Sequence, residues 1–68
     1  MKVTAEWDYD LCIWYFDLGK TSVAIPGITA SKLFHSSDPN FVEINVTFVQ
    51  ILTDDGSIKL ELKLDRLN

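Results

Sequence analysis

Apolar and polar residues alternate strictly at the start of the chain. Within residues 2–9 the apolar or aromatic positions are Val3, Ala5, Trp7 and Tyr9. A period of two predicts a strand with one buried face. The sequence allows two positions for the end of this strand. Asp8 and Asp10 favour a turn, because aspartate bonds nearby backbone N–H groups, but residues 2–17 also fit one long strand.

Residues 11–16 are apolar at both odd and even positions. Such a segment predicts a central strand that is covered on both sides. Cys12 lies within it, and we therefore expect this thiol to be buried and chemically inert. A turn at residues 17–20 should follow, with Gly19 free to adopt a positive φ.

A third short strand is predicted from Thr21 to Ile25. It should lie at or near an edge of the sheet, because Pro26 follows it and proline cannot donate to a ladder. Residues 28–38 form the only helix that the sequence indicates, with Thr29 or Ser31 as its cap. We expect its apolar residues Leu33 and Phe34 to face the sheet.

The longest predicted strand covers residues 41–52. Its alternation is clear as far as Phe48 and then blurs, because Val49 and Ile51 are apolar and Gln50 is not. Two explanations remain open at this point. One is a bulge near Val49 or Gln50, and the other is burial of both faces at that end of the strand.

A hairpin is predicted to join this strand to a final one over residues 58–65, because Asp55-Gly56 stands between two alternating runs. The alternation of the final strand places Ile58, Leu60, Leu62 and Leu64 inward. A two-residue loop would place Leu62 opposite Val49. A three-residue loop, residues 54–56, would place Leu62 opposite Phe48 and Leu64 opposite Val46. We favour the second register, because it gathers more apolar residues on one face and gives Gly56 the left-handed position.

These elements predict a mainly β fold with a minor helical part. The sheet should have five antiparallel strands and be twisted or partly closed, in the order β-β-β-short α-β-β, ending in a 41–52/58–65 hairpin. Residues 1–68 suffice for one small domain. A domain of this size has marginal stability, and with one cysteine and one histidine we expect stabilisation by a partner or by oligomerisation.

The formal net charge is −4 at pH 7. Nucleic acids and anionic membranes are disfavoured as direct partners, because their ligands usually carry a basic patch. No apolar run is long enough for a membrane span, and the first residues lack the apolar region of a secretory signal. The single cysteine favours a reducing, intracellular location, which we expect to be the cytoplasm.

No residue pattern indicates an enzyme, and no metal or cofactor is expected. Residues 19–22, Gly-Lys-Thr-Ser, lack the earlier glycine and the following helix of a phosphate-binding loop. Asp8 and Asp10 flank a turn before the second strand, and Asp17 lies in the turn after it. We expect these two turns at opposite ends of that strand, so the three carboxylates should not form a catalytic group. His35 is expected to be solvated at a helix end.

Aromatic residues give the most informative signal for function. Five aromatic residues and two acidic residues within residues 7–16 form our candidate partner-binding set: Trp7, Tyr9, Trp14, Tyr15, Phe16, Asp8 and Asp10. Trp14 and Phe16 should point to one face and Tyr15 to the other. Either the sheet curls around its own core or part of this set is exposed, and exposed aromatic patches mark binding surfaces.

The functional expectation is a non-catalytic protein–protein interaction module. A small acidic inhibitor or adaptor that blocks a larger, basic, nucleic-acid-handling protein is one form of it. A homo-oligomeric building block is the first alternative, and a small-ligand-binding β-barrel is the second. The expected partner is another protein or a second copy of the chain. Residues 21–25 are the candidate edge for adding a partner's strand.

Overall fold

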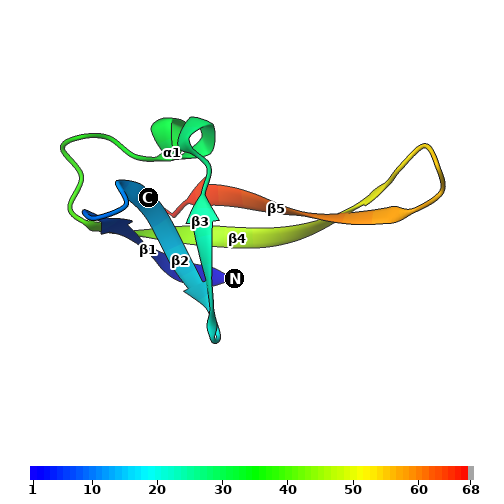
Figure 1. Cartoon of the computed structure of the whole chain (residues 1–68), viewed down its shortest axis with the longest axis horizontal. Coiled ribbons are helices and arrows are strands. Elements are labelled where there is room, and N and C mark those ends of the chain that lie inside the picture. Colours follow the sequence, from blue (N-terminus) through cyan, green and yellow to red (C-terminus); the bar gives the residue numbers. More distant parts are fainter. Residues whose placement is uncertain (68) are drawn as a thin grey trace.

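A single sheet contains every strand of the described residues. A computed structural model describes residues 1–67. Its elements are β1 (Lys2–Asp8), β2 (Ile13–Leu18), β3 (Thr21–Ile25), α1 (Gly27–Leu33), β4 (Phe41–Leu52) and β5 (Ile58–Arg66). All neighbouring strands are antiparallel, in the order β3-β2-β1-β4-β5 (Figure 1). The predicted mainly β fold, its element order and its antiparallel pairing are confirmed, and β3 lies at an edge as expected.

The connections make a Greek key. β1, β2 and β3 follow one another as a meander, and β4 returns through α1 to pair with β1 on its other side. The sheet curls into a half-barrel, with α1 above one end (Figure 1). β3 and β5 are the two edges of this open sheet.

A tight hairpin resolves the ambiguity at the start of the chain. β1 ends at Asp8, which pairs with Ile13, and residues 9–12 form the turn between them. The Asp8 carboxylate accepts hydrogen bonds from the backbone N–H groups of Asp10 and Leu11, at 2.9 and 3.1 Å. Residues 2–17 are therefore two strands.

The expectation that Cys12 is buried was wrong. Cys12 is the last turn residue before β2, and it is exposed, with a φ of 54°. The apolar run at residues 11–16 begins two residues before the strand does. Its first two side chains therefore lie in the turn and outside the core.

The core lies on the concave face of the half-barrel. It contains one buried residue or more from each of β1, β2, β3 and β4, and one that follows α1: Ala5, Phe16, Ile25, Phe34, Val42, Ile44 and Val46. Trp14, Leu33 and Leu64 are half-buried and pack against this cluster. The prediction that Leu33 and Phe34 face the sheet is confirmed.

The helix is shorter than predicted. α1 has seven residues and ends at Leu33, whereas the sequence indicated residues 28–38. Phe34 is extended, with φ −120° and ψ 150°, and its ring stacks on Trp14 at 4.0 Å between centroids. Burial of this ring outweighs helix continuation. The predicted caps were also wrong, because the N-cap residue is Pro26 and no side chain bonds to the helix start.

Arg66 joins the end of β5 to the segment between α1 and β4. Its guanidinium donates two hydrogen bonds to the Asp38 carboxylate, at 2.7 and 3.2 Å, and one to the Leu33 carbonyl at 3.1 Å. The backbone N–H of His35 also donates to Asp38, at 2.7 Å. These bonds to the charged form lower the pKa of Asp38 to about 2.

The β4–β5 hairpin has the register that the sequence favoured. Leu62 pairs with Phe48 and Leu64 with Val46, and Gly56 has a φ of 86°. The pairing runs without interruption from Ile44 to Leu52, so the proposed bulge is absent from this ladder. Burial of both faces, the other explanation, was also wrong, because residues 47–52 are exposed.

The outer part of this hairpin extends away from the rest of the molecule. We call residues 47–63 the arm and the remainder the body. The molecule measures 42 × 25 × 23 Å, and the arm forms one end of its long axis (Figure 1). The sequence predicted the two strands of this hairpin and their register correctly. It wrongly placed Ile58, Leu60 and Leu62 inward, because all three are exposed.

Candidate protein interaction site

The arm carries apolar side chains that the body does not cover. One face, which we call the apolar face, consists of Phe48, Gln50, Leu52, Ile58, Leu60 and Leu62. The exposed fractions of Phe48, Leu52 and Leu60 are 53%, 74% and 64%. Contiguous apolar surface of this kind on a small protein marks an interaction site or an aggregation liability.

The apolar face continues the core of the body. Along β4 the buried residues Val42, Ile44 and Val46 have the same parity as Phe48, so they lie on the same side of the sheet. The cross-strand pair Val46–Leu64 is followed by Phe48–Leu62 and then by Gln50–Leu60. The arm thus presents core-like residues beyond the point where the half-barrel ends.

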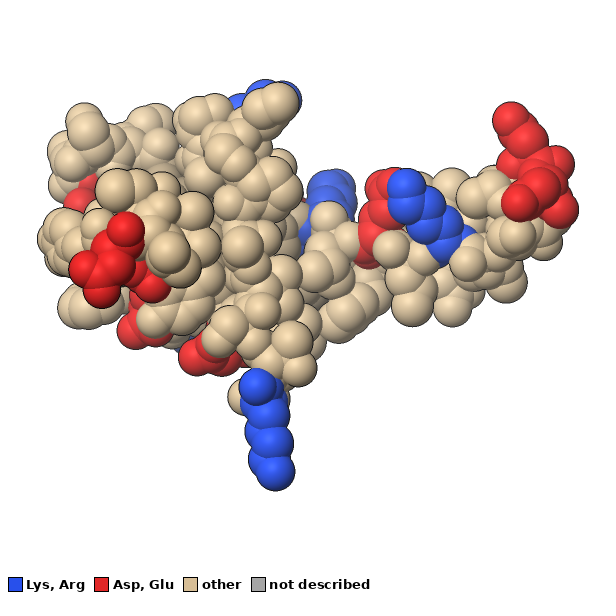
Figure 2. Space-filling view, viewed as in Figure 1, with Lys and Arg blue, Asp and Glu red and all other residues tan. Residues whose placement is uncertain are grey.

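The opposite face of the arm is mixed. It consists of Thr47, Val49, Ile51, Lys59, Glu61 and Lys63. Figure 2 shows basic, acidic and basic side chains in succession along the arm, and acidic side chains at its tip. Lys59 and Glu61 are 3.3 Å apart on the same strand. The charges on this face therefore alternate in sign.

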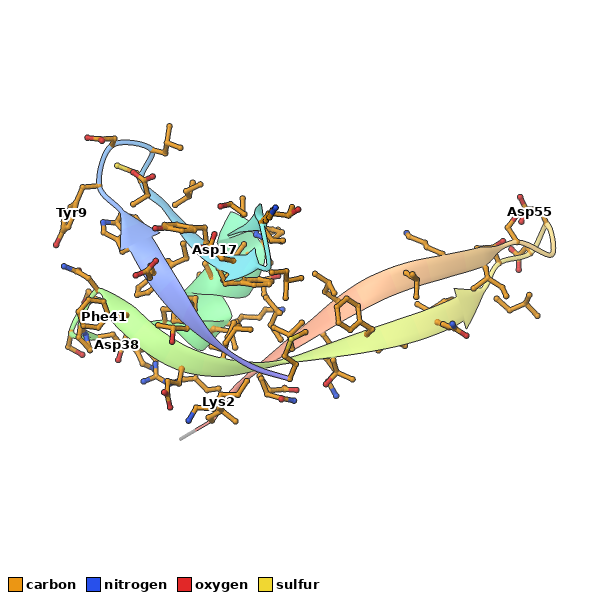
Figure 3. All side chains as sticks on the ribbon, turned by 90° about the horizontal axis from the view of Figure 1, so that it is seen from below. Lys2, Tyr9, Asp17, Asp38, Phe41 and Asp55 are labelled. Carbon is orange, nitrogen blue, oxygen red and sulfur yellow. The ribbon has the colours of Figure 1, made fainter. Side chains whose placement is uncertain are left out.

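The tip is a turn held by several hydrogen bonds. Thr53 donates its hydroxyl proton to the Asp55 carboxylate, and the backbone N–H of Ser57 donates to the same carboxylate at 2.9 Å. These bonds lower the pKa of Asp55 to about 2. Asp55 lies at the far end of the molecule from Tyr9 (Figure 3). The arm's two strands are held together by this turn and by their ladder.

The structure separates the residues that the sequence grouped as a binding set. Trp7, Trp14 and Phe16 lie on the concave face, and Phe16 is a core residue with 1% exposure. Asp8 and Tyr15 lie on the convex face. Tyr9 and Asp10 are exposed in the turn between β1 and β2. The predicted opposite orientation of Phe16 and Tyr15 is confirmed.

Three of these aromatic residues form one cluster. The ring centroids of Trp7 lie 5.8 Å from Trp14 and 6.5 Å from Tyr9. Together with Phe34 they line a pocket of about 620 Å³ between α1 and the end of the β1–β2 hairpin. Asn40 donates to the Tyr9 hydroxyl at 2.6 Å at its rim. The pocket is mainly apolar, with a few polar groups at its edge.

Tyr15 has a different role on the convex face. Its hydroxyl donates to the Glu6 carboxylate at 3.0 Å, across the β1–β2 pair. This hydrogen bond and the negative charge of Glu6 raise the pKa of Tyr15 above its ordinary value. The contact supports the strand pairing.

The sequence contains a signal for the arm that the alternation of apolar residues alone does not reveal. β4 has 12 residues, whereas its neighbour β1 has seven, so part of β4 must extend past the body. The blurred alternation after Phe48 begins where β1 no longer pairs with β4. Apolar residues on both parities outside the reach of a third strand indicate an exposed hairpin.

Among residues 1–67, no group of three or more histidine, cysteine or acidic side chains is arranged to hold a metal ion. No helix in the described part of the chain has the length and apolar character needed to cross a membrane. Comparison with protein-family models, with curated proteins and with solved structures finds no match. The class of protein is therefore described by its fold: a small open β half-barrel with a projecting hairpin.

Proposed function

We propose that this chain is a non-catalytic protein–protein interaction module, and that the arm is its main binding surface. One observation carries the proposal: the core-like face of the half-barrel continues onto an arm that no other described element covers. Water contact with these side chains is unfavourable by about 25 cal/mol per Å² of apolar area. A partner that covers the apolar face would remove this cost.

The charge distribution favours a protein over nucleic acid as the partner. An open five-stranded Greek-key barrel is also the architecture of oligonucleotide-binding folds. That likeness is one of architecture alone. Binders of nucleic acid combine aromatic residues with basic ones, whereas this chain has a net charge of −4 and an acidic arm tip.

Site-specific photo-crosslinking tests the proposal. A photoreactive phenylalanine analogue replaces Leu60 on the apolar face in one variant and Lys20 in the β2–β3 turn in another. Both positions are exposed, but only the first lies on the arm. After irradiation in cells that make the protein, we expect protein adducts at position 60 and few at position 20. Equal yields at the two positions would argue against a specific arm surface.

The mass of the adduct identifies the class of partner. An adduct of twice the chain mass is a second copy, and any other mass is a different protein. An acidic inhibitor of a basic protein would give a different-protein adduct that high salt weakens, because screening reduces charge attraction.

The aromatic pocket supports a second candidate, the binding of a small apolar ligand. Its volume of about 620 Å³ and its mainly apolar lining fall within the range of ligand sites. Binding would change the fluorescence of Trp7 and Trp14, and titration with cyclohexanol, an apolar probe that does not itself fluoresce, tests this. We expect a saturable change in emission that Ala30→Leu, which fills part of the pocket without adding a fluorophore, weakens. A linear, unsaturable change would exclude a ligand site of useful affinity.

A further inference from the structure

We infer that the arm's partner is a second copy of this chain, joined to the first by antiparallel pairing of the two β5 strands around Leu62. This inference rests on the proposed function, and it names the partner of the same surface. It is carried by the open edge of β5 and by the order of charges along it. The pairing would make one continuous sheet from the two molecules.

The edge of β5 has free backbone groups in the right places. At the start of this ladder the N–H of Thr53 donates to the Ser57 carbonyl at 2.9 Å, so that pair is hydrogen-bonded. Hydrogen-bonded and non-bonded pairs alternate in an antiparallel ladder. Odd-numbered residues of β5 therefore bond to β4. The even-numbered residues direct N–H and C=O to the open edge: Ile58, Leu60, Leu62, Leu64 and Arg66.

A two-fold axis at Leu62 uses the whole strand. β5 runs from Ile58 to Arg66, so Leu62 is its central residue. In this register Leu62 pairs with Leu62 of the second copy, and Leu60 pairs with Leu64. Both pairs join residues whose backbone groups face the open edge. The strand is thus complementary to itself over its full length, as an interface with two-fold symmetry requires.

The charges on the other face of β5 are also complementary in this register. Glu61 lies opposite Lys63 of the second copy, and Lys59 lies opposite Asp65. The two-fold axis repeats each pair, so four cross-strand pairs of opposite charge form. Opposite charges placed directly across a pair of strands stabilise it, and like charges destabilise it.

Neighbouring registers place fewer opposite charges across from each other. An axis at Glu61 places Glu61 opposite itself and Lys59 opposite Lys63. An axis at Lys63 places Lys63 opposite itself and Glu61 opposite Asp65. An axis at Leu60 pairs Lys59 with Glu61, which gives two opposite-charge pairs, and leaves Lys63 opposite Ser57. The Leu62 register therefore has the best charge complementarity.

Pairing also enlarges the apolar face. Residues that oppose each other across strands share a face, so Leu62 meets Leu62 of the second copy and Leu60 meets its Leu64 on the apolar side of the joined sheet. Ile58 lies opposite Arg66 of the second copy, at the end of the pairing. Pairing would also cover the exposed edge of β5, which is otherwise a template for the addition of further strands.

Single cysteines on β5 test the register directly. The background is Cys12→Ser, which removes the native thiol. Leu62→Cys places two thiols opposite each other, at a Cα separation of about 5.5 Å, which a disulfide spans. Leu60→Cys is the matched control, because its copies are offset by four residues along the strand. In a glutathione redox buffer we expect most of the L62C chain, and little of the L60C chain, to become a disulfide-linked dimer.

The opposite outcomes overturn the inference. Crosslinking of L60C in preference to L62C would move the axis to Leu60. Crosslinking of neither variant, together with a monomer mass by light scattering up to millimolar concentration, would exclude self-pairing. In that case photo-adducts of another protein at position 60 would leave the proposed function standing. Absence of any adduct at position 60 would contradict both the self-pairing of β5 and the proposed function of the arm.

Charge reversal supplies an independent test. Glu61→Lys would set two lysines opposite each other twice in the dimer, and we expect its dissociation constant to rise about tenfold. Adding Lys63→Glu restores opposite charges in the Leu62 register and should restore affinity. Rescue by Lys59→Glu in place of Lys63→Glu would instead indicate the axis at Leu60.

Discussion

Gly56 holds the turn of the arm in a conformation that few residues adopt. Its φ is 86°, and a Cβ built there would meet no atom within 4 Å. A substitution therefore meets backbone strain and no steric clash. Gly27, at the start of α1, has equally open surroundings but no positive φ.

We therefore predict that Gly56→Ala lowers the free energy of unfolding by about 1 kcal/mol. Gly27→Ala should change it by less than about half of that, or raise it. Urea denaturation of both variants checks the difference. An equal effect of the two substitutions would show that the turn is not held at positive φ.

Tyr15 reports on the pairing of β1 with β2. Its hydroxyl donates to Glu6, which raises the pKa of Tyr15. We predict that Glu6→Gln lowers this pKa back toward about 10, because the charged acceptor is lost. Absorbance at alkaline pH follows the titration, and Tyr15→Phe identifies the signal of Tyr15 among the two tyrosines. An unchanged titration would contradict the contact.

At the scale of elements, the Arg66–Asp38 contact ties β5 to the loop that follows α1. The pKa of Asp38 is about 2, below its ordinary 3.8. A lowered carboxyl pKa contributes stability above the unfolded-state pKa, and this contribution is lost as the pH falls through the folded-state pKa. The contact should thus support the fold fully above about pH 4 and fade toward pH 2.

Asp38→Asn is predicted to make the acid destabilisation shallower between pH 4 and pH 2. Asp55 has a pKa lowered to about 2 as well, so some pH dependence remains in this variant. Asp55→Asn and the double variant separate the two contributions. The check is the urea midpoint at several pH values, and an unchanged slope in D38N would contradict the role of the contact.

β4 runs from the core of the body into the exposed arm. Substitution of one isoleucine in each part compares the two environments. Ile44 is fully buried, whereas Ile51 on the arm is 38% exposed. In dilute monomer we predict that Ile44→Ala costs about 2–5 kcal/mol of unfolding free energy. Ile51→Ala should cost about 1 kcal/mol or less. Chemical denaturation measures both, and equal costs would show that the body covers the arm.

At the scale of the whole molecule, local patterns predicted the elements well. The alternation in residues 2–9 and 41–48, and the Asp55-Gly56 turn, gave the strands and the register of the last hairpin. These features depend on neighbours in sequence or directly across a ladder. The helix end was mispredicted because Phe34 leaves the helix for a tertiary contact with Trp14, which no local pattern contains.

The candidate site was harder to predict than the fold. Apolar alternation in residues 58–64 is the pattern of a strand that faces a core, and sequence alone assigns it to this molecule's own core. Only the lengths of the strands relative to one another show that these residues extend past the body. The aromatic set of residues 7–16 was found from composition, but its division between the two faces and the turn requires the curvature of the sheet.

The arm's separation from the body also has a dynamic consequence. β4 runs through both parts, so its amide hydrogens report on two levels of protection within a single strand. Residues 42–46 pair with β1 or β5 within the body, so we expect their amides to exchange with solvent only when the body unfolds. Amides of Val49 and Ile51, which face β5, should exchange whenever the arm's two strands part, because no other described element holds them. We therefore expect the body to stay folded while the arm opens and closes.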